Sequence, residues 1–261
     1  MRTVQATRYV LPLREGGSVP ALVEGDDLGL YVVKLRGAGQ GSKALVAELV
    51  AGELARALGL AVPEIVFIQL EERLAACEPD PELLLPLEAS VGLNLAMDYL
   101  PGSITFDPIV GPIPDKTTAS LIVLFDAFVM NVDRTARNPN ILSWHGRPWL
   151  IDHGASLYFH HGWRPDNRLE SSADRFVEVR DHVLLPWASE LRAAASHVQT
   201  HITSELIDSI TQQIPASWLA TDNHLTEIAN PAGDYADWLN ARTRALHVFL
   251  EEAERVRALR V

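Results

Sequence analysis

Short apolar runs separated by turns dominate the first hundred residues of the chain. Runs rich in Val, Ile, Leu and Tyr that are bounded by Gly, Asp or Pro are typical of β-strands. A helical spacing of apolar residues covers residues 43–58 and stops at Gly59. The expected strands lie at 4–13, 20–24, 30–35, 63–70 and 91–100. The pattern predicts a small sheet, antiparallel over its first three strands, with one prominent helix.

The pattern changes after residue 100. Residues 101–115 are rich in Pro and Gly, which is typical of a linker. Residues 117–130 are apolar nearly all round a helix, which predicts a buried helix. Apolar runs at 140–143 and 148–151 flank a Gly-containing turn and predict a short β-hairpin. Farther along, the spacing is mostly helical. The helices expected there lie at 203–214 and 235–259.

The length and this change of pattern together predict the domain organisation. A chain of 261 residues exceeds the usual size of one compact domain, so one large domain or two lobes around a cleft is expected. We predict an α/β (α+β) bilobal architecture that forms one domain overall. Residues 1–100 would be a β-rich N-lobe with one main helix, and residues 101–261 a mainly helical C-lobe.

Composition excludes several classes of protein. The formal net charge of −12 argues against general nucleic-acid binding, because phosphate neutralisation needs clustered Lys and Arg. The longest apolar run, 122–132, is too short to span a membrane. The N-terminus lacks the pattern of a secretory signal, and the single Cys77 cannot form an internal disulfide. A cytoplasmic protein is therefore expected.

Acidic and amide residues around the predicted hairpin carry the strongest chemical signal. Asp133 follows the buried helix, Asn138 lies five residues later, and Asp152 ends an apolar strand that Gly154 interrupts. In phosphoryl transfer, one carboxylate orients a hydroxyl nucleophile, while an amide oxygen and a second carboxylate hold Mg²⁺. Asn140 is an alternative metal ligand. The spacing predicts a phosphotransferase.

A phosphotransferase also needs a cation for the nucleotide phosphates, and the first hundred residues supply one. Lys34 ends an apolar strand, and Glu48 lies on the helix that follows. Glu53 is a rival partner, but residues five positions apart cannot face one spot equally well. Arg134, beside Asp133, is a further candidate catalytic residue. It would neutralise developing charge or pair with Asp133.

Glycine-rich turns offer two candidate phosphate loops. Gly16, Gly17 and Ser18 at the first turn would let backbone N–H groups approach phosphates, although a plain hairpin turn is the favoured explanation of these residues taken alone. The stretch 37–42 is the second candidate, and it is not a Walker A motif because no Gly-Lys-Ser/Thr closes it.

Histidines suggest a competing metal site near the hairpin. His160 and His161 are adjacent and point different ways, so supporting or surface roles are favoured for them and for His153. No nucleophile elbow of a hydrolase is present. The stretch 180–185 stands out without an assigned role.

With these pieces in order, the chain resembles the HipA-like kinases, most closely their compact bacterial branch, and more distantly the phosphoinositide lipid kinases. The resemblance covers roughly residues 1–165. It rests on the stretches 31–41, 47–60, 131–140 and 150–154. It implies a bilobal protein-kinase-like fold that uses ATP and Mg²⁺.

The resemblance also implies roles for single residues. Lys34 matches the lysine that binds nucleotide phosphates, and Glu48 matches its helix partner. Asp133 matches the catalytic aspartate, and Asn138 and Asp152 match the Mg²⁺ ligands. The stretch Met97, Asp98 and Tyr99 looks like the hinge, where backbone amides would hold adenine. His153 departs from the Phe of ordinary protein kinases.

The predicted function is therefore that of an ATP- and Mg²⁺-dependent kinase acting on a hydroxyl of a protein, such as serine or threonine, or of a small molecule. Two alternatives stay open: a nucleotide-binding pseudokinase that acts as a scaffold or regulatory partner, and an enzyme that transfers AMP. The acceptor, the oligomeric state and a regulatory protein partner are not disclosed by the sequence.

Overall fold

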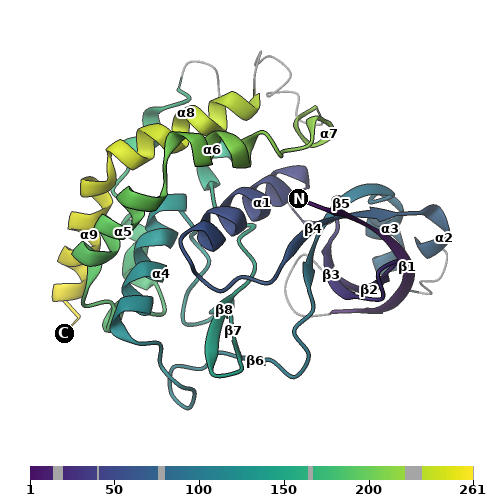
Figure 1. The fold of residues 1–261 in the computed structure, drawn as a ribbon, viewed down its shortest axis with the longest axis horizontal. Helices are drawn as coiled ribbons and strands as arrows, with labels where there is room; N and C mark the ends of the chain where they lie inside the picture. The colour runs from purple at the N-terminus through teal and green to yellow at the C-terminus, as the bar shows by residue number, and fades with distance from the viewer. Residues whose placement is uncertain (14–19, 40, 76–79, 164–166, 221–230, 261) are drawn as a thin grey trace.

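The computed structural model describes residues 1–13, 20–39, 41–75, 80–163, 167–220 and 231–260. Within them the chain forms a β-barrel and a helical body joined by a short second sheet (Figure 1). This mixture confirms the predicted α+β class. Cys77 and the Gly16, Gly17 and Ser18 turn lie outside the described residues.

Five strands close into the barrel in the order β1-β2-β3-β5-β4. The strands are β1 (Thr3–Pro12), β2 (Ala21–Gly25), β3 (Leu30–Lys34), β4 (Ile65–Leu70) and β5 (Gly92–Asp98). The first three pair antiparallel as expected, and a parallel pairing of β1 with β4 closes the barrel. Two short helices lie between β4 and β5, α2 (Glu72–Ala75) and α3 (Pro81–Glu88).

Alternation of side chains along the strands fills the barrel. Successive residues of a strand point to opposite faces, so every second apolar residue enters the interior. In β3, Tyr31 and Val33 are buried and Lys34 follows at the strand's end, half-buried. The interior is a separate apolar cluster whose members include Val4, Ala6, Val23, Tyr31, Val33, Val66, Ile68 and Ala96.

Helix α1 (Ser42–Ala57) lies between the barrel and the helical body (Figure 1). Its side chains are buried nearly all round, and they join the large core of the helical body rather than the barrel interior. Gly52 allows the helix to approach β4, because a Cβ there would lie 2.3 Å from Ile65 Cδ1. Gly59, with a φ of 79°, turns the chain away after the helix, as predicted.

A second sheet connects the two parts. It contains β6 (Ile104–Thr105), β7 (Ile141–Trp144) and β8 (Arg147–Leu150). The predicted hairpin is confirmed, and its turn has positive φ at both His145 and Gly146, which suits the twist of a tight hairpin. Strand β6 was not predicted, because the Pro- and Gly-rich stretch that contains it has only a two-residue extended segment.

The helical body surrounds the buried helix α4 (Lys116–Val129), which was predicted. Asp115 caps its start by accepting from two backbone N–H groups, and Met130 ends it with a φ of 54°. The other α-helices are α5 (Leu191–His201), α6 (Ser204–Thr211), α7 (Ala216–Leu219), α8 (Pro231–Arg244) and α9 (Leu246–Ala258). The 3₁₀ helices are η1 (Tyr158–Gly162), η2 (Glu170–Ala173), η3 (Val177–Asp181) and η4 (Leu185–Trp187).

The last predicted helix is in fact two. The apolar spacing continues through residues 235–259, but the helix is interrupted at Ala245, between α8 and α9. Next to this break, the buried Arg242 donates to the carbonyls of Ala127 and Phe128 at the end of α4. Within the described residues, no helix is both long and apolar enough to cross a membrane.

Candidate active site

Three distant segments meet at Lys34. Its ammonium donates to Glu48 Oε2, in the middle of α1, and to Asp152 Oδ1 at 2.5 Å, just after β8. Glu48 is fully buried, whereas 42% of the Asp152 side chain is exposed. The rival Glu53 pairs instead with Arg56 at 3.0 Å, one turn along its own helix. The structure thus brings Asp152 to Lys34 and Glu48, although Asp152 lies 118 positions after Lys34 in the sequence.

Electrostatics keep this cluster ionised. Burial alone would lower the pKa of Lys34, but the charges of Glu48 and Asp152 outweigh burial and raise it. Burial would likewise raise the pKa of Glu48, and the Lys34 charge with a hydrogen bond from His153 lowers it instead. Lys34 and Glu48 are therefore a charged pair in a largely dry environment.

His153 holds the second oxygen of Glu48. Its Nδ1 atom lies 3.1 Å from Glu48 Oε1, and both side chains are fully buried. The ring stands edge-on to Phe125, with 6.2 Å between centroids. His153 therefore holds the carboxylate that in turn holds Lys34, a supporting role of the kind favoured from the sequence, which did not identify Glu48 as the partner.

Asp133 lies in the loop between α4 and β7, among amide side chains. Its Oδ2 atom accepts from Asn138 Nδ2 at 2.7 Å and from Asn140 Nδ2 at 3.3 Å, and its backbone N–H donates to Asn131 Oδ1 at 3.1 Å. Burial raises the pKa of Asp133, against the lowering effect of the two amides, and the charge of Asp152 raises it further. A carboxylate of raised pKa is a better proton acceptor.

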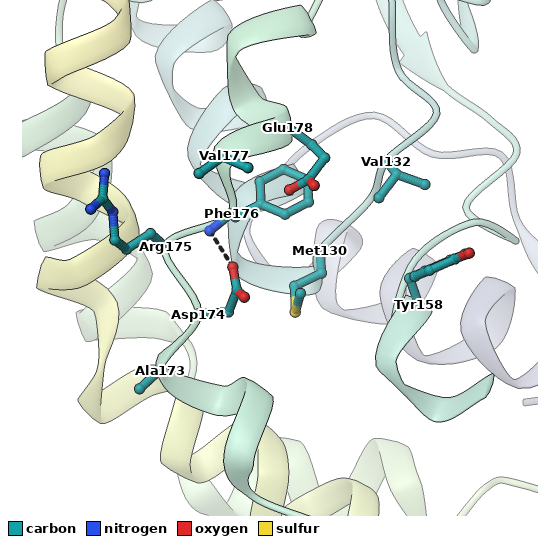
Figure 2. A pocket seen from close by; sticks show the side chains of 9 residues that line it. All are labelled: Met130, Val132, Tyr158, Ala173, Asp174, Arg175, Phe176, Val177 and Glu178. Carbon is teal, nitrogen blue, oxygen red and sulfur yellow. Dashed lines mark hydrogen bonds between the residues drawn. The ribbon is translucent and has the colours of Figure 1, made fainter. Parts of the chain in front are cut away.

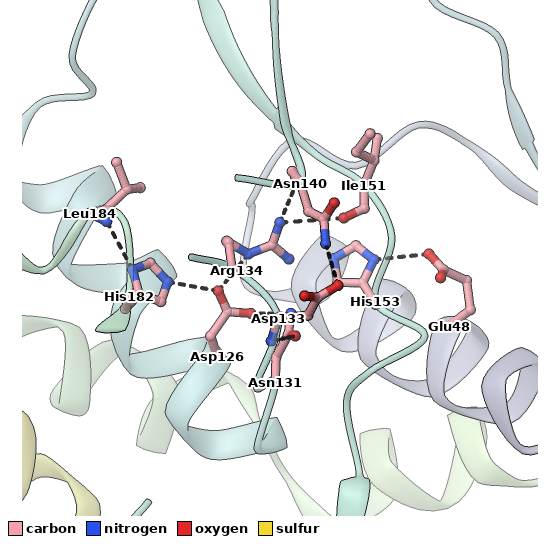
Figure 3. Close-up of polar contacts among 10 residues, drawn as sticks. All are labelled: Glu48, Asp126, Asn131, Asp133, Arg134, Asn140, Ile151, His153, His182 and Leu184. Atoms are coloured by element: carbon pink, nitrogen blue, oxygen red, sulfur yellow. Dashed lines mark hydrogen bonds and ion pairs between the residues drawn. The ribbon is translucent and has the colours of Figure 1, made fainter. Parts of the chain in front are cut away.

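Beside Asp133 lies a fully buried ionic network centred on Asp126 of α4 (Figure 3). Asp126 Oδ2 accepts from Arg134 Nε at 2.6 Å and lies 2.9 Å from His182 Nε2. Its Oδ1 atom accepts from Asn131 Nδ2 at 3.0 Å. Burial would raise the pKa of Asp126, but the Arg134 charge and the His182 hydrogen bond lower it. One carboxylate therefore holds residues on both sides of Asp133, Asn131 before it and Arg134 after it.

Arg134 extends the network to the backbone just before β7 and just after β8. Its guanidinium donates to the carbonyl of Asn140 and, at 3.3 Å, to that of Ile151, the residue before Asp152. The expected alternative, a salt bridge to Asp133, is wrong: the carboxylate that Arg134 binds is that of Asp126. The side chain has no exposed surface, so its direct effect is on the backbone that carries Asp133 and Asp152.

His182 reaches Asp126 from the far side (Figure 3). The backbone N–H of Leu184 donates to His182 Nδ1 at 3.0 Å, so the ring proton is on Nε2 and points to Asp126. Burial lowers the pKa of His182 more than Asp126 raises it, and Arg134 lowers it further. The neutral ring therefore fits both partners.

Sequence reasoning missed Asp126 and His182, and a signal existed for the first. Asp126 interrupts a helix that is otherwise apolar, and a buried carboxylate requires a partner. His182 lies in the stretch 180–185, which stood out without a role, and only the fold places it 2.9 Å from a residue 56 positions away.

The expected hinge lies along β5 and its end. Met97 is buried in the strand. The backbone N–H of Asp98 donates to Glu64 O at 2.9 Å, and that of Tyr99 donates to Leu30 O at 2.8 Å. These two amides are engaged within the barrel, so contact with adenine would require their present hydrogen bonds to break.

The remaining sequence candidates are separated from one another. In the second Gly-rich loop, Gly37 donates its N–H to Ser90 Oγ at 2.8 Å, and Gly41 has a φ of 68° just before α1. His160 is buried, with Nδ1 3.0 Å from Tyr235 Oη. Across the described parts of the chain, no three His, Cys, Asp or Glu side chains form a metal-binding group.

Known structures share this fold. The Helicobacter pylori proinflammatory kinase CtkA matches with a TM-score of 0.61 at 12% identity, over 95% of this chain and 96% of that one. The Golgi casein kinase with Mn and ADP bound matches with a TM-score of 0.53 at 13% identity, over 100% of this chain and 76% of that one. These likenesses show a protein-kinase-like fold.

Sequence comparison carries the assignment further. The comparison with curated proteins found no match. The family model of the HipA-like kinases matches residues 8–244, which is most of the chain. The predicted resemblance is thereby confirmed, and the chain belongs to the HipA-like kinase family.

Proposed function

We propose that this protein is an ATP- and Mg²⁺-dependent phosphotransferase with an N-lobe at residues 1–100 and a C-lobe at 101–261. The observation that carries the proposal is the meeting of Lys34, Glu48 and Asp152, next to a loop in which Asp133 is held by two amides. The proposal agrees with the family and the fold. A bound nucleotide and metal ion in one structural neighbour support it.

Lys34 would bind the α- and β-phosphates of ATP, and Glu48 would keep its ammonium in place. His153 and Lys34 each take one oxygen of Glu48, so the carboxylate has little freedom to turn away. The Lys34 contact with Asp152 is the weaker restraint, because the Asp152 side chain is partly exposed. The hinge stretch 97–99 would lie beside the adenine, and the Gly16, Gly17 and Ser18 turn near the phosphates.

Asp152 and Asn138 would hold Mg²⁺, and Asn140 is an alternative ligand. Carboxylate and amide oxygens are the donors that Mg²⁺ prefers. The charge also fits: Lys34 is shared by two carboxylates, Glu48 and Asp152, and Asp133 adds a third. A bound metal ion would neutralise charge on the transferring phosphate.

Asp133 would orient the acceptor hydroxyl and take its proton. The new bond forms between the acceptor oxygen and the γ-phosphorus, while the bond from that phosphorus to the ADP oxygen breaks. Asn138 and Asn140 fix one oxygen of Asp133, and its raised pKa suits proton transfer. Arg134 would act indirectly, because it binds the backbone carbonyls of Asn140 and Ile151 and so holds the segments that carry the site residues.

Thermal unfolding with ATP, with Mg²⁺ and with both tests the proposal. A ligand that binds the native state raises the melting temperature by mass action. We expect a shift that needs both ligands and that is lost in Asp152→Ala. The matched control is Asp208→Ala, which removes an exposed carboxylate on α6. The absence of any shift in the wild type would overturn the proposal and favour a scaffold without nucleotide.

The mass of a labelled product separates the two transfer reactions. A phosphorylated acceptor gains about 80 Da and an adenylylated one about 329 Da, because these are the masses of the added groups. Nucleotide binding without consumption of ATP would indicate the pseudokinase alternative.

A further inference from the structure

A cavity of about 530 Å³ opens between the start of the Asp133 loop and residues 173–178, which include the first two residues of η3 (Figure 2). Val132, the residue before Asp133, forms part of its wall. An occupant of this cavity would therefore contact the residue that precedes the proposed catalytic aspartate in the sequence. The cavity is lined by Met130, Val132, Tyr158, Ala173, Asp174, Arg175, Phe176, Val177 and Glu178.

The walls combine apolar surface with negative charge. Met130, Val132 and Phe176 provide apolar side chains, and Asp174 and Glu178 provide exposed carboxylates. The one cation of the lining, Arg175, extends toward α9 (Figure 2) and donates to Glu252 Oε2 there at 2.7 Å. The charge that faces an occupant is thus negative.

The segment around Asp174 is held by several hydrogen bonds. Buried Arg242 donates to the carbonyl oxygens of Asp174 and, at 3.1 Å, Ser172. Asp174 Oδ1 accepts from the backbone N–H of Phe176 at 2.6 Å. Phe176 and Met130 both have positive φ, 53° and 54°, which is unfavourable for such side chains and persists only where the surroundings impose it. The cavity is therefore a preformed feature.

The cavity is open to solvent, and this indicates the size of its occupant. Two of its lining residues, Tyr158 and Val177, are 53% and 43% exposed. Sites for small molecules usually enclose most of the ligand surface. An open cavity that covers only one side of its occupant suits part of a larger body, such as one or two residues of a polypeptide.

We propose that this cavity binds a Lys or Arg side chain of a polypeptide acceptor, close in sequence to the Ser or Thr that receives the phosphate. Apolar walls suit the alkyl stem of a basic side chain, and the carboxylates of Asp174 and Glu178 suit its charged head. The inference rests on the proposed function and names the acceptor class of that same site.

Peptide libraries test the inference. Each peptide has one central Ser or Thr and, at one flanking position, a fixed Lys, Arg, Ala or Glu. Phosphorylation by the wild type is compared with that by Glu178→Lys and by a control, Glu251→Lys, which makes the same charge change at an exposed site on α9. Asp174→Asn is a second variant, because its amide oxygen still accepts from Phe176. Thermal unfolding confirms that each variant is folded.

We expect kcat/KM of the wild type to favour Lys or Arg over Ala by tenfold or more at one or two flanking positions. Glu178→Lys should reduce this preference to twofold or less, Asp174→Asn should weaken it, and Glu251→Lys should keep it. Phosphorylation without a basic preference, or a preference that survives both cavity variants, overturns the inference. Either result would leave the proposed phosphotransferase function unaffected.

A failure to phosphorylate any peptide also overturns the inference, because a polypeptide acceptor is part of it. The ATP- and Mg²⁺-dependent thermal shift then decides the proposed function separately, since it needs no acceptor.

Discussion

Two ionic clusters lie on either side of Asp133, and they are built differently. The first shares the single cation of Lys34 between Glu48 and Asp152, and Asp152 is partly exposed. The second, around Asp126, matches one carboxylate with one guanidinium and a neutral His182, all of them buried. The first has negative charge left over at its solvent end, while the second has none.

This difference in charge balance suggests that the first cluster binds a ligand and the second positions the Asp133 loop. A buried and balanced cluster gains nothing from a further ion, and breaking it leaves a charge without a partner. A cluster with excess charge at an open end can accept a cation without dismantling its buried pair. Replacing the aspartate should therefore destabilise the fold strongly in the balanced cluster and only slightly in the cluster with excess charge.

The largest expected effect is on the balanced cluster. Asp126→Ala leaves Arg134 buried without its partner, so we expect a loss of about 3–5 kcal/mol in the free energy of unfolding. Urea unfolding measures it. Asp126→Asn, which keeps an acceptor for Arg134, should lose less. An unchanged midpoint in Asp126→Ala would show that the network does not stabilise the fold.

Asp133 lies between the two clusters, and its substitution should slow the transfer reaction without weakening nucleotide binding. Asp133→Ala removes the proposed base, and we expect the transfer rate to fall by a factor of about 10²–10⁴. The affinity for nucleotide should stay within about twofold, because Lys34 and Asp152 are untouched. Single-turnover kinetics and nucleotide titration measure the two quantities. Normal turnover in this variant would remove Asp133 from the mechanism.

In the cluster with excess charge, Asp152→Asn should leave stability nearly unchanged. Lys34 keeps Glu48, so we expect the free energy of unfolding without ligands to change by less than about 1 kcal/mol, the range of a partly exposed pair. Mg²⁺-dependent nucleotide binding should weaken by tenfold or more. A loss of stability as large as that of Asp126→Ala would erase the distinction between the clusters.

The smallest effect concerns pH and the balanced cluster. The native pKa of His182 lies below its unfolded value, because the ring is buried. Between the two values the unfolded chain binds more protons, so stability is complete above the unfolded pKa of about 6.5 and is lost as pH falls below it. We expect urea midpoints to decrease from pH 7 to pH 5, and less steeply in His182→Gln. Parallel pH profiles would count against a role for His182.

Local patterns were enough to predict much of this molecule. The strands of the barrel, helices α1 and α4, and the hairpin follow from apolar spacing. Lys34 and Glu48 were paired in advance because each ends or occupies a well-marked element, and the structure brings their side chains together. Asp152 was expected only as a metal ligand, and its contact with Lys34 was not predicted.

Long-range contacts were beyond the sequence. Arg134 adjoins Asp133, yet neighbouring residues point in different directions, and the partner of Arg134 comes from α4. The parallel pairing that closes the barrel joins Val4 to Ile68, and no local pattern specifies it. The break at Ala245 contains neither Gly nor Pro, so the helical spacing runs through it.

The position of α1 has a consequence for dissecting this protein into fragments. The helix carries Glu48 in the N-terminal half of the gene, but its apolar face completes the core of the helical body. Helix α5 reinforces the junction through His197, whose Nε2 lies 3.0 Å from Leu58 O, and Trp218 of α7 donates to Leu93 O at 3.3 Å. A fragment that stops near residue 100 would expose that apolar face to water and would aggregate rather than behave as an autonomous nucleotide-binding module.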